Sequence, residues 1–579
     1  MNPNNVNRFA SAAVGVTRAR SKFLRPSKHL TTFNSGKLIP LYVDEVLPGD
    51  NMKIKFNAVC RMATPLNPVM DNAYLDVYAF FVPNRLVWDH WKEFQGENNT
   101  DFWTQKTEYQ VPQIYISDNT DRKTRANSGD FDVFNYLGIQ PNYNANSVGT
   151  LSVSALPSRA YVKIWNDWFR DENVDYPCHL YTDDTSRPYD YGTTSVAPWV
   201  TGAELGGGLC PVNKFKDYFT SCLPSPQKGN AVSVSLGEFA PVVTTNISSS
   251  TPLINQSVPL RISPTAGGTW SNDTDYIDFF GQSATLSDSG SRRFSNLVGS
   301  QTISSSPTPN TAVAPSNLYT DLSSATAITV NQLRTMFQTQ KYMETLARGG
   351  SRYIETLYSM FGVKASDKTL QRSQYLGGKR IPIEMTQVAQ TSSDNGESPL
   401  GNVAAFSLTG FSEYVADSFF EEHGFLMIVG CVRTDQTYAQ GVERFWFRKN
   451  RFDYYYPVFA NLGEQAVLNR EIYYDGSVKD TEVFGYQEAW AEYRYKPNRA
   501  SALMNPNATN GLGAWSYVNK FASLPVLNDA FLRQSPTNVN QTISLSSDLA
   551  HQFICDMYIE NESVRVMPMY SVPGLIDHA

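Results

Sequence analysis

The first 37 residues carry the strongest chemical bias in the chain, because they contain seven basic side chains and no acidic one. Spaced cations of this kind neutralise phosphates without reading bases. The segment has little periodicity, so we expect an arm that becomes ordered on binding and not a helix. We predict that residues 1–37 are a basic N-terminal arm, with a solvated tail as the alternative. Its candidate nucleic-acid-binding residues are Arg8, Arg18, Arg20, Lys22, Arg25 and Lys28.

Catalytic chemistry has no comparable signal. Gly378-Lys379 is followed by Arg380 where a phosphate-binding loop requires Ser or Thr, and no HExxH or GxSxG motif occurs. Glu421, Glu422 and His423 could form an acid–base or metal cluster, but a solvated loop edge is the favoured interpretation. Cys178-His179 has no second ligand pair at zinc-finger spacing. We therefore expect no enzyme activity, no cofactor and no metal.

The composition points to a large protein with much surface against other protein. Of its 579 residues, 18% are charged and 13% are aromatic, and aromatic side chains anchor buried interfaces. A tyrosine-rich β fold would explain the same numbers. The net charge is −7, but outside the arm the chain holds 41 basic and 55 acidic residues. The six cysteines are scattered and indicate reduced thiols. No apolar run is long enough to span a membrane.

The elements that must position these residues are mostly strands, separated by long connections. Residues 52–62 alternate between apolar and polar side chains, as in a half-buried strand. Residues 73–82 are apolar on both faces, as in a strand packed on both sides. Further strands are expected at 425–433, 483–495 and 552–560. Helices are expected at 85–94 after an Asn84 cap, after a Ser158 cap, from about residue 329 to 349, and at 354–361. Dispersed strands of this kind favour an antiparallel sandwich with long loops.

Residues 242–327 differ in composition from the rest of the chain. Of these 86 residues, 30 are Ser or Thr, eight are charged and none is Lys. Short apolar pieces, such as Trp270 and residues 276–280, are more than a plain linker carries. We therefore predict a folded surface insertion.

The sequence also resembles the major capsid proteins of the gokushovirus branch of the Microviridae. The resemblance rests on residues 31–50 (TTFNSGKLIPLYVDEVLPGD), 64–88 (TPLNPVMDNAYLDVYAFFVPNRLVW), 218–228 (YFTSCLPSPQK), 332–361, 371–378 (QRSQYLGG) and 567–575 (MPMYSVPGL). These blocks lie at both ends and in the middle of the chain. The resemblance therefore covers nearly all of it except the insertion.

The family implies a mainly β fold, an eight-stranded antiparallel viral jelly roll with large interstrand insertions and a few helices. Residues 38–241 and 328–579 would form this body. Many copies would self-assemble into a T=1 icosahedral shell around circular single-stranded DNA. In the family, the insertion projects outward near the threefold axes toward the host. Trp270, Asp273, Asp275 and Tyr276 are then the candidate host-contacting residues.

The same resemblance implies the partners. These are other copies of the chain, the single-stranded DNA genome, a small basic DNA-binding virion protein, an internal scaffolding protein, a minor pilot protein, and a host surface receptor that could be a glycan. The location would be the virion, assembled in the cytoplasm of a bacterial host. The arm could bind DNA or tie neighbouring subunits together. The alternative function is a carbohydrate-binding or carbohydrate-active β-sandwich protein, for which hydrolysis would require paired carboxylates.

Overall fold

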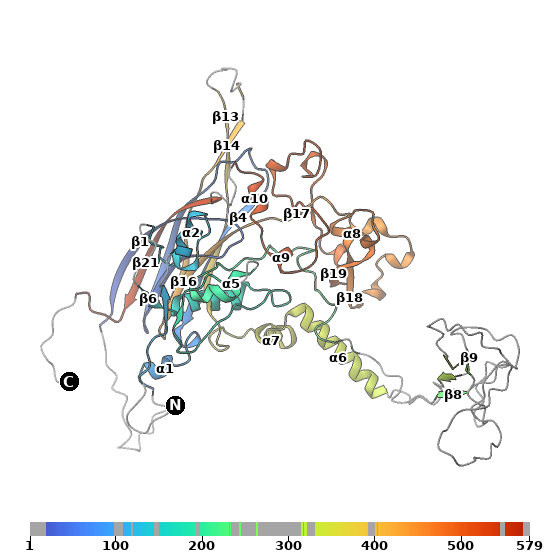
Figure 1. Ribbon diagram of the computed structural model, residues 1–579, viewed down its shortest axis with the longest axis horizontal. Coiled ribbons are helices and arrows are strands. Elements are labelled where there is room, and N and C mark those ends of the chain that lie inside the picture. The colour runs from blue at the N-terminus through green and yellow to red at the C-terminus, as the bar shows by residue number, and fades with distance from the viewer. Residues whose placement is uncertain are drawn as a thin grey trace, which may run out of the picture. The chain divides into compact units, whose positions relative to one another are not determined.

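The computed structural model describes residues 19–97, 108–116, 120–143, 150–192, 197–230, 232, 242–244, 262–263, 314–315, 318–320, 330–391, 400–401, 403–544 and 551–570 (Figure 1). By its internal contacts the chain divides into two units, residues 1–228 with 344–579, and residues 229–343. The first unit contains two four-stranded sheets, described next.

Eight strands form the two sheets. In chain order they are β1 (Ser21–Phe33), β2 (Ile39–Val46), β3 (Asn51–Met62), β4 (Ala73–Pro83), β12 (Gln374–Pro382), β15 (Thr409–Phe419), β16 (Gly424–Thr434) and β21 (Phe553–Arg565). One sheet has the order β1-β21-β3-β15 and the other β12-β4-β16-β2, and every neighbouring pair is antiparallel. Numbered one to eight, the strands run 1-8-3-6 and 5-4-7-2. This is the double Greek key of a jelly roll, so the predicted fold is confirmed.

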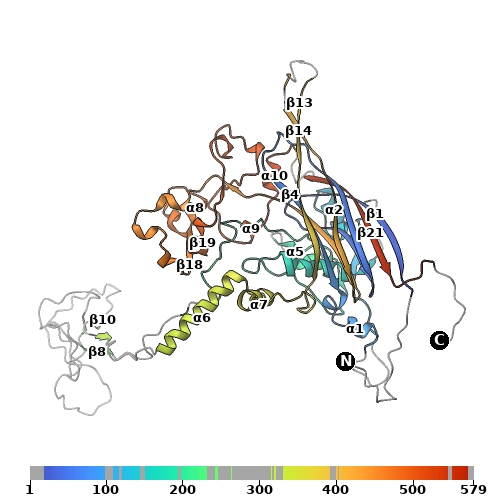
Figure 2. The same cartoon turned by 180° about the vertical axis from the view of Figure 1, so that it is seen from behind.

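The two sheets share one hydrophobic core (Figures 1 and 2). In β3 the inward side chains Met52, Ile54 and Phe56 are fully buried, and the residues between them are not. This alternation is the pattern predicted from the sequence. In β4 and β16 both faces are largely buried, because α4 (Leu156–Ile164) contacts both strands.

The connections between the strands are long, as predicted. Between β4 and β12 lie α1 (Trp91–Phe94), β5 (Gln113–Ile116), α2 (Thr120–Asn127), α3 (Val133–Tyr136), β6 (Leu151–Ser154), α4, β7 (Arg187–Pro188), α5 (Pro198–Gly202), β8 (Val242–Thr244), β9 (Ile262–Ser263), β10 (Ala314–Pro315), β11 (Leu318–Thr320), α6 (Val330–Gly349) and α7 (Tyr353–Phe361). Between β12 and β15 lies the hairpin of β13 (Met385–Ala389) and β14 (Val403–Ser407). Between β16 and β21 lie β17 (Thr437–Tyr438), β18 (Glu464–Leu468), α8 (Asn469–Ile472), β19 (Val483–Glu488), β20 (Asn498–Arg499), α9 (Asp529–Leu532) and α10 (Thr537–Asn540). No helix among the described residues is long and apolar enough to cross a membrane.

Three local predictions were wrong because tertiary contacts override the pattern. The helix expected at 85–94 is only a short turn and α1, because the buried Trp88 donates a hydrogen bond to Asp184 (2.6 Å). Ser158 does not cap a helix but lies inside α4 and donates to the Glu204 carbonyl oxygen (2.6 Å). The strand expected at 483–495 ends at residue 488, because Trp490 adopts a left-handed backbone (φ 65°). Both α6 and α7 are present as predicted.

A buried carboxyl–guanidinium pair lies in the long connection between β4 and β12. Glu204 and Arg159 each have 2% exposed side chains, and their charged atoms lie 3.4 Å apart. The Tyr181 backbone N–H donates to Glu204 (2.9 Å). Burial nevertheless raises the pKa of Glu204 from its ordinary 4.5 to about 7, because desolvation outweighs the nearby positive charge. This carboxyl group therefore titrates near neutral pH.

Candidate nucleic-acid interface

Much of the predicted basic arm is a strand of the sandwich. Residues 21–33 form β1, which pairs with β21 from Ser21 opposite Arg565 to Phe33 opposite Phe553. The expectation of an irregular arm reaching residue 37 is therefore wrong for these residues, because a partner strand more than 500 positions away satisfies their backbone. Arg8 and Arg18 lie outside the described residues.

The pleat of β1 separates its cations into two groups. Lys22 and Lys28 point to the outer face of the sheet and are exposed, whereas Arg25 points toward the β2 side. Arg20, just before the strand, donates to the Gly49 carbonyl oxygen and lies over the ring of Phe419 (5.6 Å). The four cations are therefore not one continuous phosphate-binding stripe.

Arg25 takes part in a polar network between β1, β2 and β21. Its guanidinium donates to both carboxylate oxygens of Asp44, one at 3.2 Å, and to Ser563 (3.4 Å). Asn561 also donates to Asp44 (2.8 Å) and to the Tyr42 hydroxyl (2.9 Å). Burial and the Asp44 charge raise the pKa of Tyr42 to about 12, so its hydroxyl stays protonated. The pairing indicates that Arg25 holds strands together.

Lys22 and Lys28 have acidic partners on β21. Lys22 lies 2.6 Å from Glu562, and Lys28 lies 3.0 Å from Asp556. All four side chains are at least 40% exposed, and exposed pairs of this kind are weak. A phosphate could therefore displace either carboxylate at little cost.

The inner strand β3 adds cations that our site prediction did not include. Lys53, Lys55 and Arg61 point to the same outer face as Lys22 and Lys28. Lys53 lies 4.0 Å from Asp417 and 4.6 Å from the ring centre of Tyr414. Among the described residues, neither Lys55 nor Arg61 has a carboxylate partner. The alternating sequence of residues 52–62 contains these cations, but only the strand register places them on the same sheet face as the lysines of β1.

The outer face of the sheet β1-β21-β3-β15 is thus a mixed surface. Its cations are Lys22, Lys28, Lys53, Lys55 and Arg61, and its carboxylates are Asp417, Asp556, Glu560 and Glu562. The exposed rings of Tyr414 and Tyr558 lie on the same face. Aromatic faces beside cations whose carboxylate partners can be displaced suit single-stranded nucleic acid without sequence preference.

Comparison with known proteins identifies the family. Residues 11–575 match the family model described as capsid protein (F protein). The chain is 37% identical over 568 residues to capsid protein VP1 of Spiroplasma virus 4, covering 96% of this chain and 95% of that protein. It is 34% identical to capsid protein VP1 of Chlamydia phage 1, covering 98% of each, and 35% identical to that of Bdellovibrio phage phiMH2K, covering 96% of each. The chain belongs to this capsid protein family.

The match confirms the resemblance to gokushovirus capsid proteins and gives this chain the role of major capsid protein, a structural component of the virion. The predicted host-contacting residues of the capsid protein, Trp270, Asp273, Asp275 and Tyr276, lie outside the described residues. The expectation that they contact the host remains a prediction.

The acidic residues that could have formed a catalytic cluster serve separate ion pairs. Glu422 binds Arg85, with 2.6 Å between Oε2 and Nε, and Glu421 binds Lys368. His423 packs edge-on against Trp91. Each of the two carboxylates is therefore bound to a different cation. Within the described ranges, no group of three or more His, Cys, Asp or Glu side chains is arranged to hold a metal.

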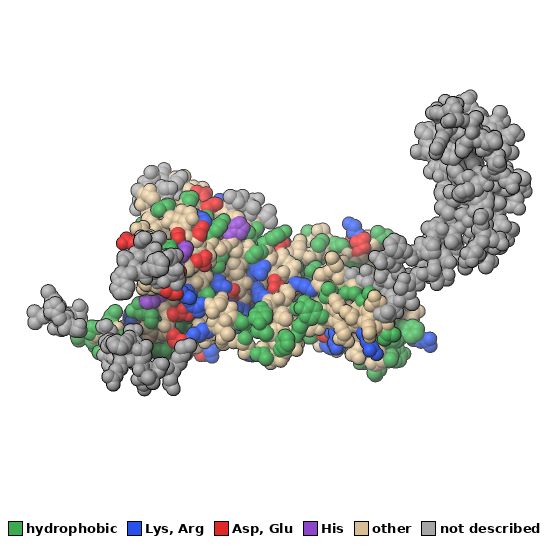
Figure 3. Space-filling view, turned by 90° about the horizontal axis from the view of Figure 1, so that it is seen from below, with side chains coloured by type: hydrophobic (Ala, Val, Ile, Leu, Met, Phe, Trp, Pro, Cys, Tyr) green, Lys and Arg blue, Asp and Glu red, His purple; other side chains and the backbone are tan. Residues whose placement is uncertain are grey.

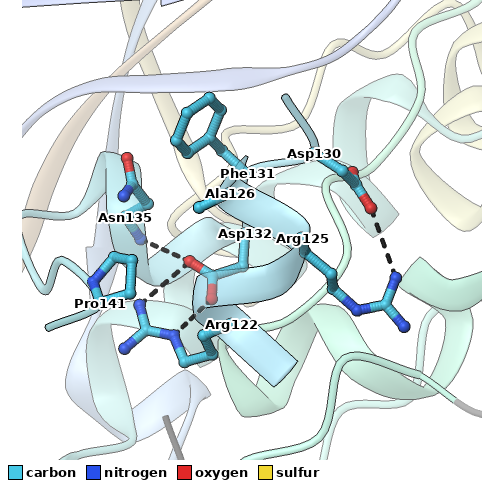
Figure 4. A pocket seen from close by; sticks show the side chains of 8 residues that line it. All are labelled: Arg122, Arg125, Ala126, Asp130, Phe131, Asp132, Asn135 and Pro141. Carbon is cyan, nitrogen blue, oxygen red and sulfur yellow. Dashed lines mark hydrogen bonds and ion pairs between the residues drawn. The ribbon is translucent and has the colours of Figure 1, made fainter. Parts of the chain in front are cut away.

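A small pocket near α2 and α3 is closed by its own charges (Figure 4). Arg122 donates through Nε and Nη2 to the two carboxylate oxygens of Asp132 (2.6 and 3.1 Å). Asp132 also accepts from the Asn135 backbone N–H at the start of α3 (2.8 Å). The pocket leaves no volume for a water-sized molecule. Its ion pairs and hydrogen bonds stabilise the segment of α2 and α3, and the pocket offers no ligand site.

Proposed function

We propose that this capsid protein assembles from many copies into a closed T=1 icosahedral shell around a circular single-stranded DNA genome. The observation that carries the proposal is the eight-stranded jelly roll in a chain matched along nearly its whole length by phage capsid proteins. Jelly rolls recur in viral capsids because the rigid sandwich carries long, variable loops that contact neighbouring subunits. The role is purely structural, without enzyme activity.

The genome-facing surface combines the sheet and the segment before it. Arg8 and Arg18 precede β1 in the sequence, and the exposed cations of β1 and β3 continue onto the outer sheet face. The small basic DNA-binding virion protein supplies the remaining neutralisation. Internal scaffolding and minor pilot proteins complete assembly in the cytoplasm of the bacterial host. In this proposal residues 242–327 face outward and contact a host surface receptor, for which a glycan is one candidate.

Electron microscopy tests the shell. The full chain, expressed with the scaffolding protein of its phage, should give particles of uniform diameter in negative stain. A chain that remains monomeric under these conditions would contradict the proposal.

Truncation tests the genome contact, and the structure sets where to cut. Deleting residues 1–18 removes two cations and leaves β1 intact, whereas a cut at residue 28 would also remove part of the pairing with β21. The 1–18 deletion should assemble but package less DNA. DNA association that does not change with salt concentration would rule out phosphate contacts. Replacing the same two arginines with glutamine is the matched control for chain length.

A further inference from the structure

A cavity opens beside the loops that join β17, β18 and β19. Its volume is about 270 Å³, and its walls include Tyr218, Phe445, Tyr493 and Tyr495. The volume is large enough for a buried side chain of another molecule. Most of its lining residues belong to the segment 443–497, which is drawn in orange around α8 in Figures 1 and 2.

A cluster of exposed aromatic rings, called the aromatic rim below, lies in the same segment of the chain as this cavity and shares Phe445, Tyr493 and Tyr495 with its wall. Tyr455 packs on Trp490 (5.7 Å between ring centres) and on Tyr493 (6.1 Å). Phe452 packs on Phe459 (6.1 Å). The rim consists of Phe445, Trp446, Phe452, Tyr454, Tyr455 and Tyr456, together with Tyr493 and Tyr495 of the cavity wall. All eight side chains are 43–67% exposed in the single chain.

This exposure is unusual for so many large rings in one place. On the face drawn in Figure 3, hydrophobic side chains form patches with charged side chains between them, and a large exposed apolar patch marks an interaction site. A fully buried aromatic side chain removes 150–250 Å² from water, so eight half-exposed rings offer roughly 800 Å². A standard protein interface buries about 800 Å² on each partner. The rim alone therefore supplies the area of one side of a stable interface.

The charges around the cavity are already paired. Arg448 lies 2.9 Å from Glu492, Arg444 lies 3.4 Å from Glu471, and Lys496 lies 3.4 Å from Glu443. Tyr218 donates a hydrogen bond to Glu471 (3.0 Å). Because three cations face three carboxylates, the surface can lose water without leaving an unpaired charge. A phosphate or another anion would have to break these pairs, so the cavity fits a neutral, largely apolar partner.

We propose that the cavity and its aromatic rim are a contact surface between neighbouring copies of this chain, with a side chain of the second copy filling the cavity. Tyr, Trp and Arg are the residues that dominate binding at protein interfaces, and the rim is built from rings stacked with guanidinium groups, as Arg448 over Tyr493 (4.6 Å). The second copy is the occupant because the exposed area of the rim matches one side of a standard protein interface, and each subunit of the proposed shell has other copies of this chain as its neighbours. The inference rests on the proposed shell.

Oxidative footprinting of assembled particles and of released subunits tests this surface directly. Hydroxyl radicals should modify Trp446 and Phe452 at least about fivefold more slowly in particles than in subunits, because an interface excludes water. Equal rates in both states would overturn the proposal. Slow modification that appears only when a panel of oligosaccharides is added to particles would also overturn it, and would assign the rim to a glycan receptor.

A variant supplies the second readout. Trp446→Ala with Phe452→Ala removes two exposed rings and should leave the fold intact, which circular dichroism and the thermal midpoint check. It should raise the subunit concentration needed for assembly by about tenfold or more. Tyr115→Ala, at a 41% exposed ring on β5, is the matched control and should assemble as the unaltered chain does. Normal assembly of the double variant would refute the surface. Failure of the unaltered chain to assemble would refute the shell itself.

Discussion

Replacing Arg25 with alanine separates a structural role from a DNA-binding role for this cation. Sequence composition groups it with the phosphate-binding residues, but the structure pairs it with Asp44 and Ser563. The Arg25 side chain is 37% exposed and that of Asp44 is 15% exposed. Arg25→Ala should therefore lower stability and leave the affinity for DNA nearly unchanged.

The expected magnitude lies between two limits. Breaking a fully buried ion pair costs about 3–5 kcal/mol, and an exposed pair is worth about 0–1 kcal/mol. Because the pair is partly exposed, Arg25→Ala should lower the free energy of unfolding by about 2 kcal/mol. Lys28→Ala, which removes a cation of the same strand from an exposed pair with Asp556, should cost less than about 1 kcal/mol. Urea unfolding of released subunits, followed by tryptophan fluorescence, measures both variants.

The salt dependence of binding to single-stranded DNA gives the second measurement. Each phosphate contact contributes about 0.7 to the slope of log K against log salt concentration. Arg25→Ala should keep the slope of the unaltered chain, and Lys55→Ala should reduce it by about 0.7. A reduction of that size in the Arg25 variant, with unchanged stability, would refute the assignment of Arg25 to the strand network.

Three further predictions concern stability. Between pH 4.5 and 7 the folded chain binds a proton at Glu204 that the unfolded chain releases, so the free energy of unfolding should fall by about 3 kcal/mol as pH rises through this window. Glu204→Gln should remove this pH dependence from urea midpoints measured at pH 5 and 7.5. A difference between the variant and the unaltered chain that is the same at both pH values would contradict the prediction. The Asp76 side chain is 1% exposed and accepts a hydrogen bond from Arg433 (2.9 Å), so Asp76→Ala should lower the free energy of unfolding by about 3 kcal/mol in the same urea assay. A decrease below about 1 kcal/mol would be inconsistent with a buried ion-pair network. Gly36→Ala places a Cβ 2.0 Å from a carbonyl oxygen at a φ of +82°, so it should abolish soluble expression. Gly138 has a φ of +99° but open space around it, so Gly138→Ala should lower stability by only about 1 kcal/mol. Equal expression and stability of the two variants would be evidence against the steric argument.

Strands with a local signal were the predictable part of the fold. The alternation of residues 52–62 and the apolar run at 425–433 reflect burial within the strand itself, so each could be recognised without its partner. The resemblance to capsid proteins then supplied the jelly roll. The prediction of a helix at 85–94 was wrong because the burial of Trp88 depends on Asp184, almost a hundred residues away.

The candidate site was harder to predict. β1 alternates less regularly than β3, its cations gave it the composition of an irregular arm, and its partner β21 lies at the other end of the sequence. Lys55 and Arg61 belong to the same surface only through the register of three strands. Position within a sheet is a property of pairing, and pairing across 500 residues leaves no local trace.

The pairing of β1 with β21 also orders events during synthesis. β21 lies between β1 and β3, so the sheet cannot close until residues 553–565 have left the ribosome. Contacts this distant in sequence carry a large loop-closure cost and form slowly. A nascent or truncated chain therefore presents open strand edges and no completed sandwich. A chain that ends before residue 553 therefore lacks the folded sandwich that a capsid subunit needs.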